Sequence, residues 1–141
     1  MKNISNKNQV ILISGGTQGL GLAVADQLIA QGCRKIAVTG RDAAKGEVAI
    51  NHIKAQGAEA LYLQCDAASI EDCQSVVAKT IDHFGTVDGL LNAAADTSRG
   101  TLLDSSAELW DRHMNINLRA PFLLMQGVAN HLVGQSKGGS M

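Results

Sequence analysis

Near its N-terminus the chain reads Val10-Ile11-Leu12-Ile13-Ser14-Gly15-Gly16-Thr17-Gln18-Gly19-Leu20-Gly21. The first four residues form an apolar run rich in β-branched side chains, and such a run before a turn is typical of a buried strand. Leu20, Val24 and Leu28 then recur at a spacing of four, which predicts a helix that ends near Gly32. The segment therefore predicts a strand, a glycine-rich turn and a helix, in that order.

A turn in this position suits a pyrophosphate group. Backbone N–H groups and the positive end of a helix dipole meet at the start of a helix, and both favour an anion. We expect a Cβ at Gly15 or Gly19 to crowd the phosphates, and Gly21 to let the helix pack closely on the strand. The alternative is an ordinary strand–turn–helix joint with glycines for tightness, but the strand before and the helix after favour phosphate binding.

The same alternation continues along the chain. It predicts strands over 36–39, 60–65 and 87–93, and helices over 43–56, 70–84 and 105–133. Ser69 is a candidate N-cap, and Ser105-Ser106-Ala107-Glu108 matches a capping box at the start of the last helix. The pattern predicts an α/β fold, a doubly wound parallel sheet of Rossmann type with helices on both faces. We expect one domain over residues 1–141, truncated after the fourth strand and its following helix, which leaves that strand as an exposed edge.

Composition excludes several classes of function. The 12 basic and 13 acidic residues give a formal charge of −1, which lacks the positive excess that nucleic acids or anionic membranes require. The apolar runs are too short to span a bilayer, and Met1–Asn8 has no apolar signal-peptide region. Cys33, Cys65 and Cys73 lack CxxC spacing, and the four histidines lack ligand spacing. We therefore expect no disulfide, no metal site and a cytoplasmic location.

Four motifs, in this order and spacing, resemble those of the short-chain dehydrogenase/reductase family. They are the Gly-x-x-x-Gly-x-Gly turn from Gly15, Asp66 after the third strand, Asn92-Ala93-Ala94-Ala95 after the fourth, and Asn117 in the last helix. The resemblance runs from about Gln9 to Ser140. It implies an oxidoreductase that transfers a hydride between a nicotinamide dinucleotide and a small-molecule carbonyl or alcohol substrate.

The resemblance also implies cofactor-binding roles. In the family the glycine turn binds the pyrophosphate, the acid after the third strand bonds the adenine amino group, and an Asn-Asn-Ala-Gly element passes close to the cofactor. The residues that match are Gly15, Thr17, Gln18, Gly19, Leu20, Gly21, Asp66, Ala67, Asn92 and Ala94. Ala93 and Ala95 depart from the family element, and we expect binding to survive both changes. Without the resemblance, the alternative for Asp66 is a solvated loop carboxylate that caps the next helix, and the alternative for Asn92–Ala95 is a buried strand end.

The end of the second predicted strand bears on the choice of dinucleotide. A carboxylate about 20 residues after the glycine turn bonds the ribose 2′-hydroxyl of NAD, whereas an arginine accommodates the 2′-phosphate of NADP. In the family the acid of NAD enzymes usually stands where this chain has Gly40, and Arg41 follows it. We therefore expect NADP(H). Asp42 beside Arg41, and Gln18 where many NADP enzymes carry a base, leave NAD as the alternative.

The last predicted helix carries the catalytic candidate. Asn117 matches the Asn of the family's catalytic tetrad, which holds a kink in the helix and positions a water of the proton relay. Pro121 cannot donate a hydrogen bond to the carbonyl of Asn117, so a distortion is expected independently of the resemblance. Asn115 is the nearby competitor, but the Leu-Arg-Ala-Pro-Phe sequence favours Asn117. The helix after Ser105 is apolar on more than one side, and the resemblance implies a homo-oligomer contact there.

The family's proton donor has no match in this sequence. The family uses a Ser, and a Tyr with a Lys three or four residues further on, but the one tyrosine here is Tyr62, inside a predicted strand and without that Lys. We expect a core residue at Tyr62 and no dehydrogenase activity from this chain alone, because hydride transfer without proton transfer leaves an unstabilised alkoxide. The alternatives are a non-catalytic dinucleotide-binding module, as a sensor or structural unit, and a remnant that binds nothing.

Overall fold

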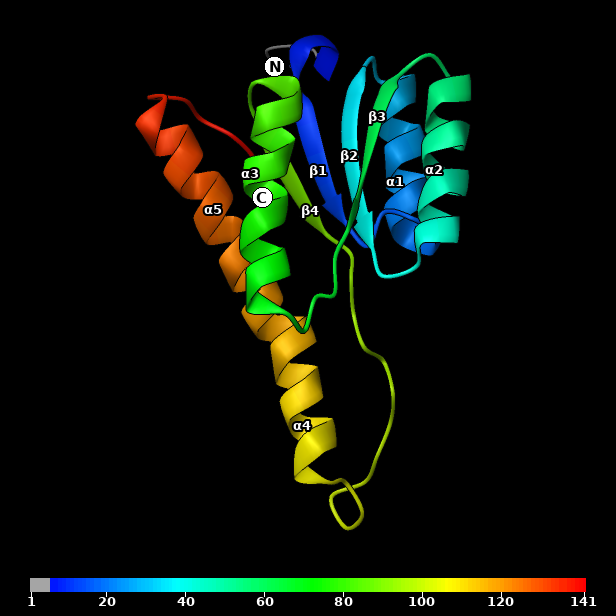
Figure 1. Ribbon diagram of the computed structural model, residues 1–141, viewed down its shortest axis with the longest axis vertical. Coiled ribbons are helices and arrows are strands. Elements are labelled where there is room, and N and C mark those ends of the chain that lie inside the picture. The colour runs from blue at the N-terminus through cyan, green and yellow to red at the C-terminus, as the bar shows by residue number, and fades with distance from the viewer. Residues whose placement is uncertain (1–5) are drawn as a thin grey trace.

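The computed structural model describes residues 6–141, which form one parallel sheet in the order β3-β2-β1-β4 (Figure 1). The strands are β1 (Val10–Ser14), β2 (Lys35–Gly40), β3 (Glu59–Gln64) and β4 (Gly89–Asn92). The helices are α1 (Gly19–Ala30), α2 (Ala43–Ala55), α3 (Ile70–Phe84), α4 (Ala107–Met114) and α5 (Ala120–Gly134), with a 3₁₀ turn η1 (Asn6–Asn8) and a π-helical turn η2 (Asn115–Arg119). Helices α1 and α2 cover one face and α3 and α5 the other, which confirms the predicted doubly wound sheet. Part of the polar stretch Met1–Asn8 lies outside the described residues.

The two faces of β1 pack into separate apolar cores. Ile11 and Ile13 lie with Ile29 of α1 and Ile53 of α2, whereas Leu12 lies with Leu124 of α5 on the opposite face. All of β1 is buried, because it runs between β2 and β4 and helices cover both of its sides. Burial on both faces explains why the strand reads as a continuous apolar run and not as an alternating one.

Three helices begin at a side-chain N-cap. Asp42 caps α2, Ser69 caps α3 and Ser106 caps α4, each through an oxygen that accepts from the backbone N–H three residues further on. The cap at Ser69 is confirmed, but the predicted capping box at Ser105 is wrong by one residue. The N–H of Ser105 donates to the carbonyl of Thr101 at 3.0 Å, which commits Ser105 to the preceding turn.

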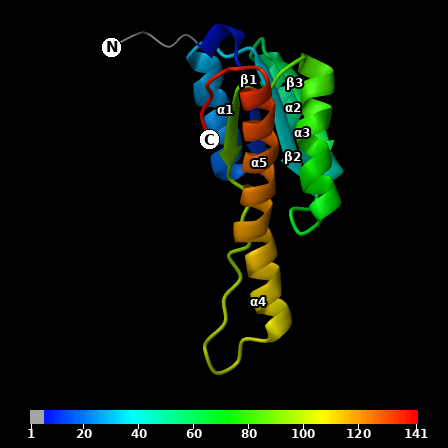
Figure 2. The same ribbon diagram turned by 90° about the vertical axis from the view of Figure 1, so that its left-hand side faces the viewer.

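The long helix predicted over 105–133 is interrupted by the π-helical turn η2. There the N–H of Ala120 donates to the carbonyl of Asn115, five residues back. Pro121 offers no N–H to the carbonyl of Asn117, and the wider turn accommodates the missing bond, so the expected distortion is confirmed. Figure 2 shows that α4 and the loop before it extend beyond the sheet. Within residues 6–141, no helix has both the length and the apolar character to cross a membrane.

The outer edge of β4 is partly covered. The N–H of Leu90 donates to the carbonyl of Ser140 at 2.9 Å, and the N–H of Ser140 donates to the carbonyl of Asp88 at 3.3 Å. These bonds form a parallel bridge between Ser140 and Gly89. The expectation of a fully exposed edge is therefore wrong at this end of the strand, where Leu90 is buried.

Candidate cofactor-binding site

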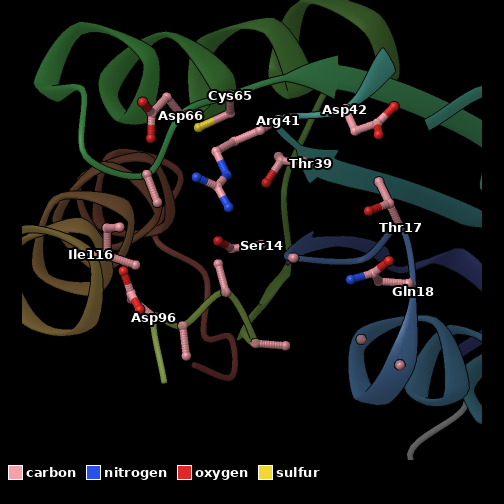
Figure 3. Close-up of a pocket in the computed structure, with 18 of the residues that line it drawn as sticks. Ser14, Thr17, Gln18, Thr39, Arg41, Asp42, Cys65, Asp66, Asp96 and Ile116 are labelled. Atoms are coloured by element: carbon pink, nitrogen blue, oxygen red, sulfur yellow. The ribbon is translucent and has the colours of Figure 1, made fainter. Parts of the chain in front are cut away.

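A hollow of about 490 Å³ opens at the carboxyl ends of the strands. The loops after β1, β2, β3 and β4 all line it, and its volume is typical of a small-molecule site. Ligands of open parallel sheets bind at this edge, beside strands whose connections leave toward opposite faces. Strands β1 and β4 are such a pair. The predicted cofactor residues that line the hollow are Gly15, Thr17, Gln18, Gly19, Leu20, Gly21, Arg41, Asp66, Ala67 and Ala94 (Figure 3).

The glycine turn between β1 and α1 forms one wall of the hollow. Gly15 has φ +75°, and a Cβ there would lie 2.6 Å from the backbone nitrogen of Ala94, so glycine lets the turn contact the loop after β4. A Cβ at Gly21 would overlap the carbonyl oxygen of Gly15. The close contact that Gly21 permits is therefore with the turn directly after β1, while Ala25 and Ile29 of α1 pack on Ile11 and Ile13 of the strand itself. Gly19 has φ +55° and open space beside it, so the crowding expected at Gly19 does not involve protein atoms.

The first turn of α1 borders the hollow with its backbone amides. Gln18 precedes the helix in an extended conformation, and its side chain makes no capping hydrogen bond. Among the described residues 6–141, the first N–H groups of α1 therefore have no side-chain acceptor, and the positive end of the helix dipole lies at the same place. Both features suit a bound anion.

Polar and charged side chains gather where β2 ends. Figure 3 shows the guanidinium of Arg41 in the open space of the hollow and the carboxylate of Asp42 directed away from it. Asp42 is engaged as the N-cap of α2, because its Oδ1 accepts from the backbone N–H of Lys45 at 3.1 Å. The Nζ of Lys45 donates to the Oε1 of Gln18 at 2.8 Å, and both residues line the hollow.

The loop after β3 forms another wall. The Oδ1 of Asp66 accepts from the N–H of Ala68 at 3.0 Å, and the N–H of Asp66 donates to the Oδ2 of Asp72 at 2.8 Å. These two bonds fix a tight turn beside the hollow. Since Ser69 caps α3, the alternative in which Asp66 caps that helix is wrong.

Two buried thiols lie behind this wall. Cys65 borders the hollow, and Cys73 lies near the start of α3. The thiol of Cys73 donates to the carbonyl of Ala67 at 3.6 Å, and the neighbouring Cys73 thiol together with burial raises the pKa of Cys65. Cys33 is also buried, so the interpretation of the cysteines as buried free thiols is confirmed. Within residues 6–141, no three His, Cys, Asp or Glu side chains are grouped as metal ligands would be.

The predicted catalytic residue Asn117 lies beside the hollow and not in its lining. Its side-chain amide forms hydrogen bonds with the backbone N–H and the carbonyl of Asp96, a residue of the loop after β4 that lines the hollow. The carboxylate of Asp96 accepts hydrogen bonds from Ser98 and from Arg112. These hydrogen bonds hold the pKa of the Asp96 carboxyl well below its usual range, and those from Ser98 have the largest effect on it.

Asn92 is the one predicted cofactor residue that does not line the hollow. It lies in β4 two residues after Leu90, so its side chain leaves the sheet on the face that α5 covers. Its Oδ1 is buried and has no hydrogen-bond partner within the described part of the chain. A contact between Asn92 and the cofactor stays a prediction.

Comparison with known families identifies the chain. A family model described as short chain dehydrogenase matches residues 9–140. The chain belongs to the short-chain dehydrogenase family. Its similarity to 2,5-dichloro-2,5-cyclohexadiene-1,4-diol dehydrogenase of Sphingobium indicum is 35% identity over 127 residues, which covers 89% of this chain and 48% of that protein.

Solved structures superpose closely on this member of the short-chain dehydrogenase family. A metagenomic short-chain oxidoreductase in complex with NADP gives a TM-score of 0.88 at 28% identity, over 96% of this chain and 62% of that one. NAD⁺-bound xylitol dehydrogenase also gives 0.88, at 26% identity, over 95% of this chain and 52% of that one. The chain spans about half the length of the curated relatives it matches.

Some residues that line the hollow of this short-chain dehydrogenase were not predicted as site residues from the sequence. They are Thr39, Lys45, Arg112 and Ile116. Lys45 left a usable signal, because a first-turn residue after a cap at Asp42 must lie at the edge where β2 ends. Arg112 lies in α4 and Ile116 in η2, after a long irregular loop. No local sequence pattern predicts that the chain comes back to the hollow at these two residues.

Proposed function

We propose that the hollow binds NADP(H) and that the chain serves an oxidoreductase acting on a small-molecule carbonyl or alcohol. The observation that carries this proposal is that the glycine turn, the Asp66 loop and the Ala94 loop line one hollow at the start of α1. The cofactor, when bound, supplies or accepts the hydride. The chain's own residues bind and orient it.

The fit of this group to the site is supported at the first turn of α1. The amides there lack a side-chain cap, and the space beside Gly19 is open, so a pyrophosphate has both donors and room. Asp66 lies across the hollow, where its carboxylate would accept from the adenine amino group. Ala94 lies against Gly15 on the other side of the glycine turn, in the loop after β4. These positions agree with the roles that the family resemblance assigns.

Preference for NADP(H) over NAD(H) is supported by the charges at the end of β2. Gly40 offers no carboxylate to a ribose 2′-hydroxyl, and the neighbouring Asp42 is engaged in capping α2. Arg41 is left as the nearest charge in the open space, and a guanidinium suits a phosphate. NAD(H) remains the alternative, because the solved neighbours include complexes with NADP and complexes with NAD.

The single tyrosine is not placed to protonate a substrate. The hydroxyl of Tyr62 donates to the carbonyl of Gly40 at 2.8 Å, and burial raises the pKa of Tyr62. The side chain is half-buried in β3 and packs on Gly46, so its predicted core position is only partly met. We infer that the 141-residue chain alone does not turn over a carbonyl substrate. A non-catalytic dinucleotide-binding module is the second candidate, and it shares the same binding step.

Self-association is proposed through one face of α4, η2 and α5. An apolar stripe follows this face and is 37–65% exposed; its members are Trp110, Met114, Leu118, Phe122 and Met125. The opposite face, with Ile116, Ala120 and Leu124, is buried against the sheet. A second copy of the chain, with the same stripe, is the occupant that the resemblance favours.

Fluorescence titration with NADPH and NADH tests the binding proposal on the 141-residue chain. Gly19→Ala adds one methyl group at the proposed pyrophosphate position, and we expect it to weaken NADPH binding about tenfold or more. Gly57→Ala is the matched control, because Gly57 also has positive φ and open space but lies outside the hollow. Absence of binding of either dinucleotide to the unmodified chain would contradict the proposal.

A further inference from the structure

Three side chains converge on the mouth of the hollow from three separate elements. Gln18 ends the glycine turn, Arg41 follows β2 and Lys45 lies in the first turn of α2. Lys45 reaches across to Gln18 with an Nζ–Oε1 distance of 2.8 Å, which joins the start of α1 to the start of α2. Lys45 is exposed, so this hydrogen bond holds a charged group at the edge of the open space.

The charge balance at this mouth is positive. Within residues 6–141, neither Arg41 nor Lys45 forms an ion pair with a carboxylate. The nearest acid in sequence, Asp42, has its Oδ1 on the N–H of Lys45 at 3.1 Å and serves the helix instead. Two cations without carboxylate partners beside an open hollow suit a dianionic phosphate better than a neutral hydroxyl pair.

A side chain at the position of an NAD-type acid would require Thr17 to shift. A Cβ at Gly40 would lie 2.8 Å from the Cγ2 of Thr17 and 2.9 Å from its Oγ1. Thr17 thus occupies the space into which a carboxylate at residue 40 would grow. Where β2 ends, the hollow is therefore lined by two cations, Arg41 and Lys45, and by one acid, Asp42, which caps α2.

Gln18 explains how Lys45 is held there. Its side chain does not cap α1, and its amide oxygen is engaged with Lys45. An amide is neutral, so it orients the ammonium without cancelling its charge, and a preordered side chain loses less entropy when a ligand binds. Residue 18 is also the position at which many NADP enzymes of the family carry a base. In this chain residue 18 is a neutral glutamine, and Lys45 of α2 brings a positive charge next to it.

We propose that Lys45 is a second cation, beside the already proposed Arg41, that binds the ribose 2′-phosphate of NADP(H), and that Gln18 positions Lys45. The inference rests on the proposed function, since it requires the dinucleotide to occupy the hollow. It adds a specificity-determining cation that the sequence motifs do not indicate.

Dissociation constants for NADPH and NADH test the role of Lys45. Lys45→Met removes the charge and retains the length of an exposed side chain. We expect it to weaken NADPH binding about tenfold, as for loss of a charge-assisted hydrogen bond, and NADH binding less than twofold. Lys54→Met is the matched control, because Lys54 lies in the last turn of the same helix and outside the hollow. We expect Lys54→Met to leave both constants unchanged.

The outcomes separate this inference from the proposed function. If the unmodified chain binds neither dinucleotide, the proposed function fails and the inference fails with it. If the chain binds NADPH but Lys45→Met changes both constants equally, or neither, the inference is overturned while the proposed function stands. Thermal melting of each variant establishes that the fold is retained.

A double-mutant cycle tests the positioning role of Gln18. We expect Gln18→Ala to weaken NADPH binding about threefold in the unmodified chain and to have no further effect beside Lys45→Met. Gln18→Lys combined with Lys45→Met returns a cation to the same place, and we expect it to restore the preference for NADPH. Additive losses in the cycle, or failure of Gln18→Lys to restore the preference, would overturn the role of Gln18.

Discussion

Asn117 holds Asp96 by both of its backbone groups. The Oδ1 of Asn117 accepts from the N–H of Asp96 at 2.8 Å, and its Nδ2 donates to the carbonyl of Asp96 at 2.9 Å. The π-helical turn η2 carries Asn117, so the distortion beside Pro121 is coupled to the course of the loop after β4. The predicted catalytic Asn thus has a structural role here, as the anchor of a loop that lines the hollow.

Removal of this anchor is expected to loosen the loop. Asn117→Ala loses two hydrogen bonds of about 1 kcal/mol each, so we expect the free energy of unfolding to fall by about 1–2 kcal/mol. Urea unfolding measures the change, and limited proteolysis within 93–106 reports the loop. Asn115→Ala is the control, and an equal loss in that variant would contradict the assigned anchor.

Acid is expected to remove the contribution of the Asp96 carboxylate. Its pKa in the folded chain is below the ordinary 3.8, first because of the hydrogen bonds from Ser98 and then because of Arg112. A depressed pKa stabilises the fold above pH 3.8, and this stabilisation is lost as the pH falls below that value. We therefore expect the stability difference between the unmodified chain and Asp96→Asn to shrink between pH 5 and pH 2.5 in urea unfolding. A difference that stays constant over this range would exclude the effect.

Two glycines are expected to respond oppositely to alanine. Gly21→Ala places a methyl group on the carbonyl oxygen of Gly15, and we expect a loss of about 1–3 kcal/mol, as for overpacked sites. Gly134 ends α5 with no atoms near a built Cβ, so Gly134→Ala is expected to stabilise by about 0.4–1 kcal/mol through the unfolded chain. Thermal melts of both variants give the comparison, and the same sign of change in both would refute it.

The apolar stripe is expected to drive self-association. Leu118→Lys places a charge at its centre, and we expect a shift toward the monomer in analytical ultracentrifugation. Val48→Lys changes a comparably exposed residue on α2, outside the stripe, and should leave the distribution unchanged. A monomeric unmodified chain would show that the stripe does not bind a second copy.

Much of the fold could be predicted, because residues on the buried face of a helix or strand must be apolar and therefore recur at the spacing of that element. The apolar run of β1 and the glycines after it indicated the strand, turn and helix, and Pro121 indicated a distortion, although not its π-helical form. The choice between Ser105 and Ser106 as helix cap could not be predicted, since the hydrogen bond to Thr101 decides it.

Contacts between distant elements were the least predictable part of the site. Lys45 and Gln18 are 27 residues apart, and their hydrogen bond depends on the lateral placement of α1 and α2 at the sheet edge. A pattern of apolar residues fixes which face of each helix is buried and not how far each helix extends over the hollow. For the same reason, the bonds of Asn117 to Asp96 could not be read from the motif that carries Asn117.

The most direct test of the account is an NMR titration of the ¹⁵N-labelled chain with NADPH. We predict that the amide signals of Gly19, Leu20 and Gly21 shift in a saturable manner, with those of Arg41 and Ala94, while Gly57 and Gly85 stay in place. Saturable binding that leaves the signals at the start of α1 unmoved would contradict the claim that this helix end receives the pyrophosphate.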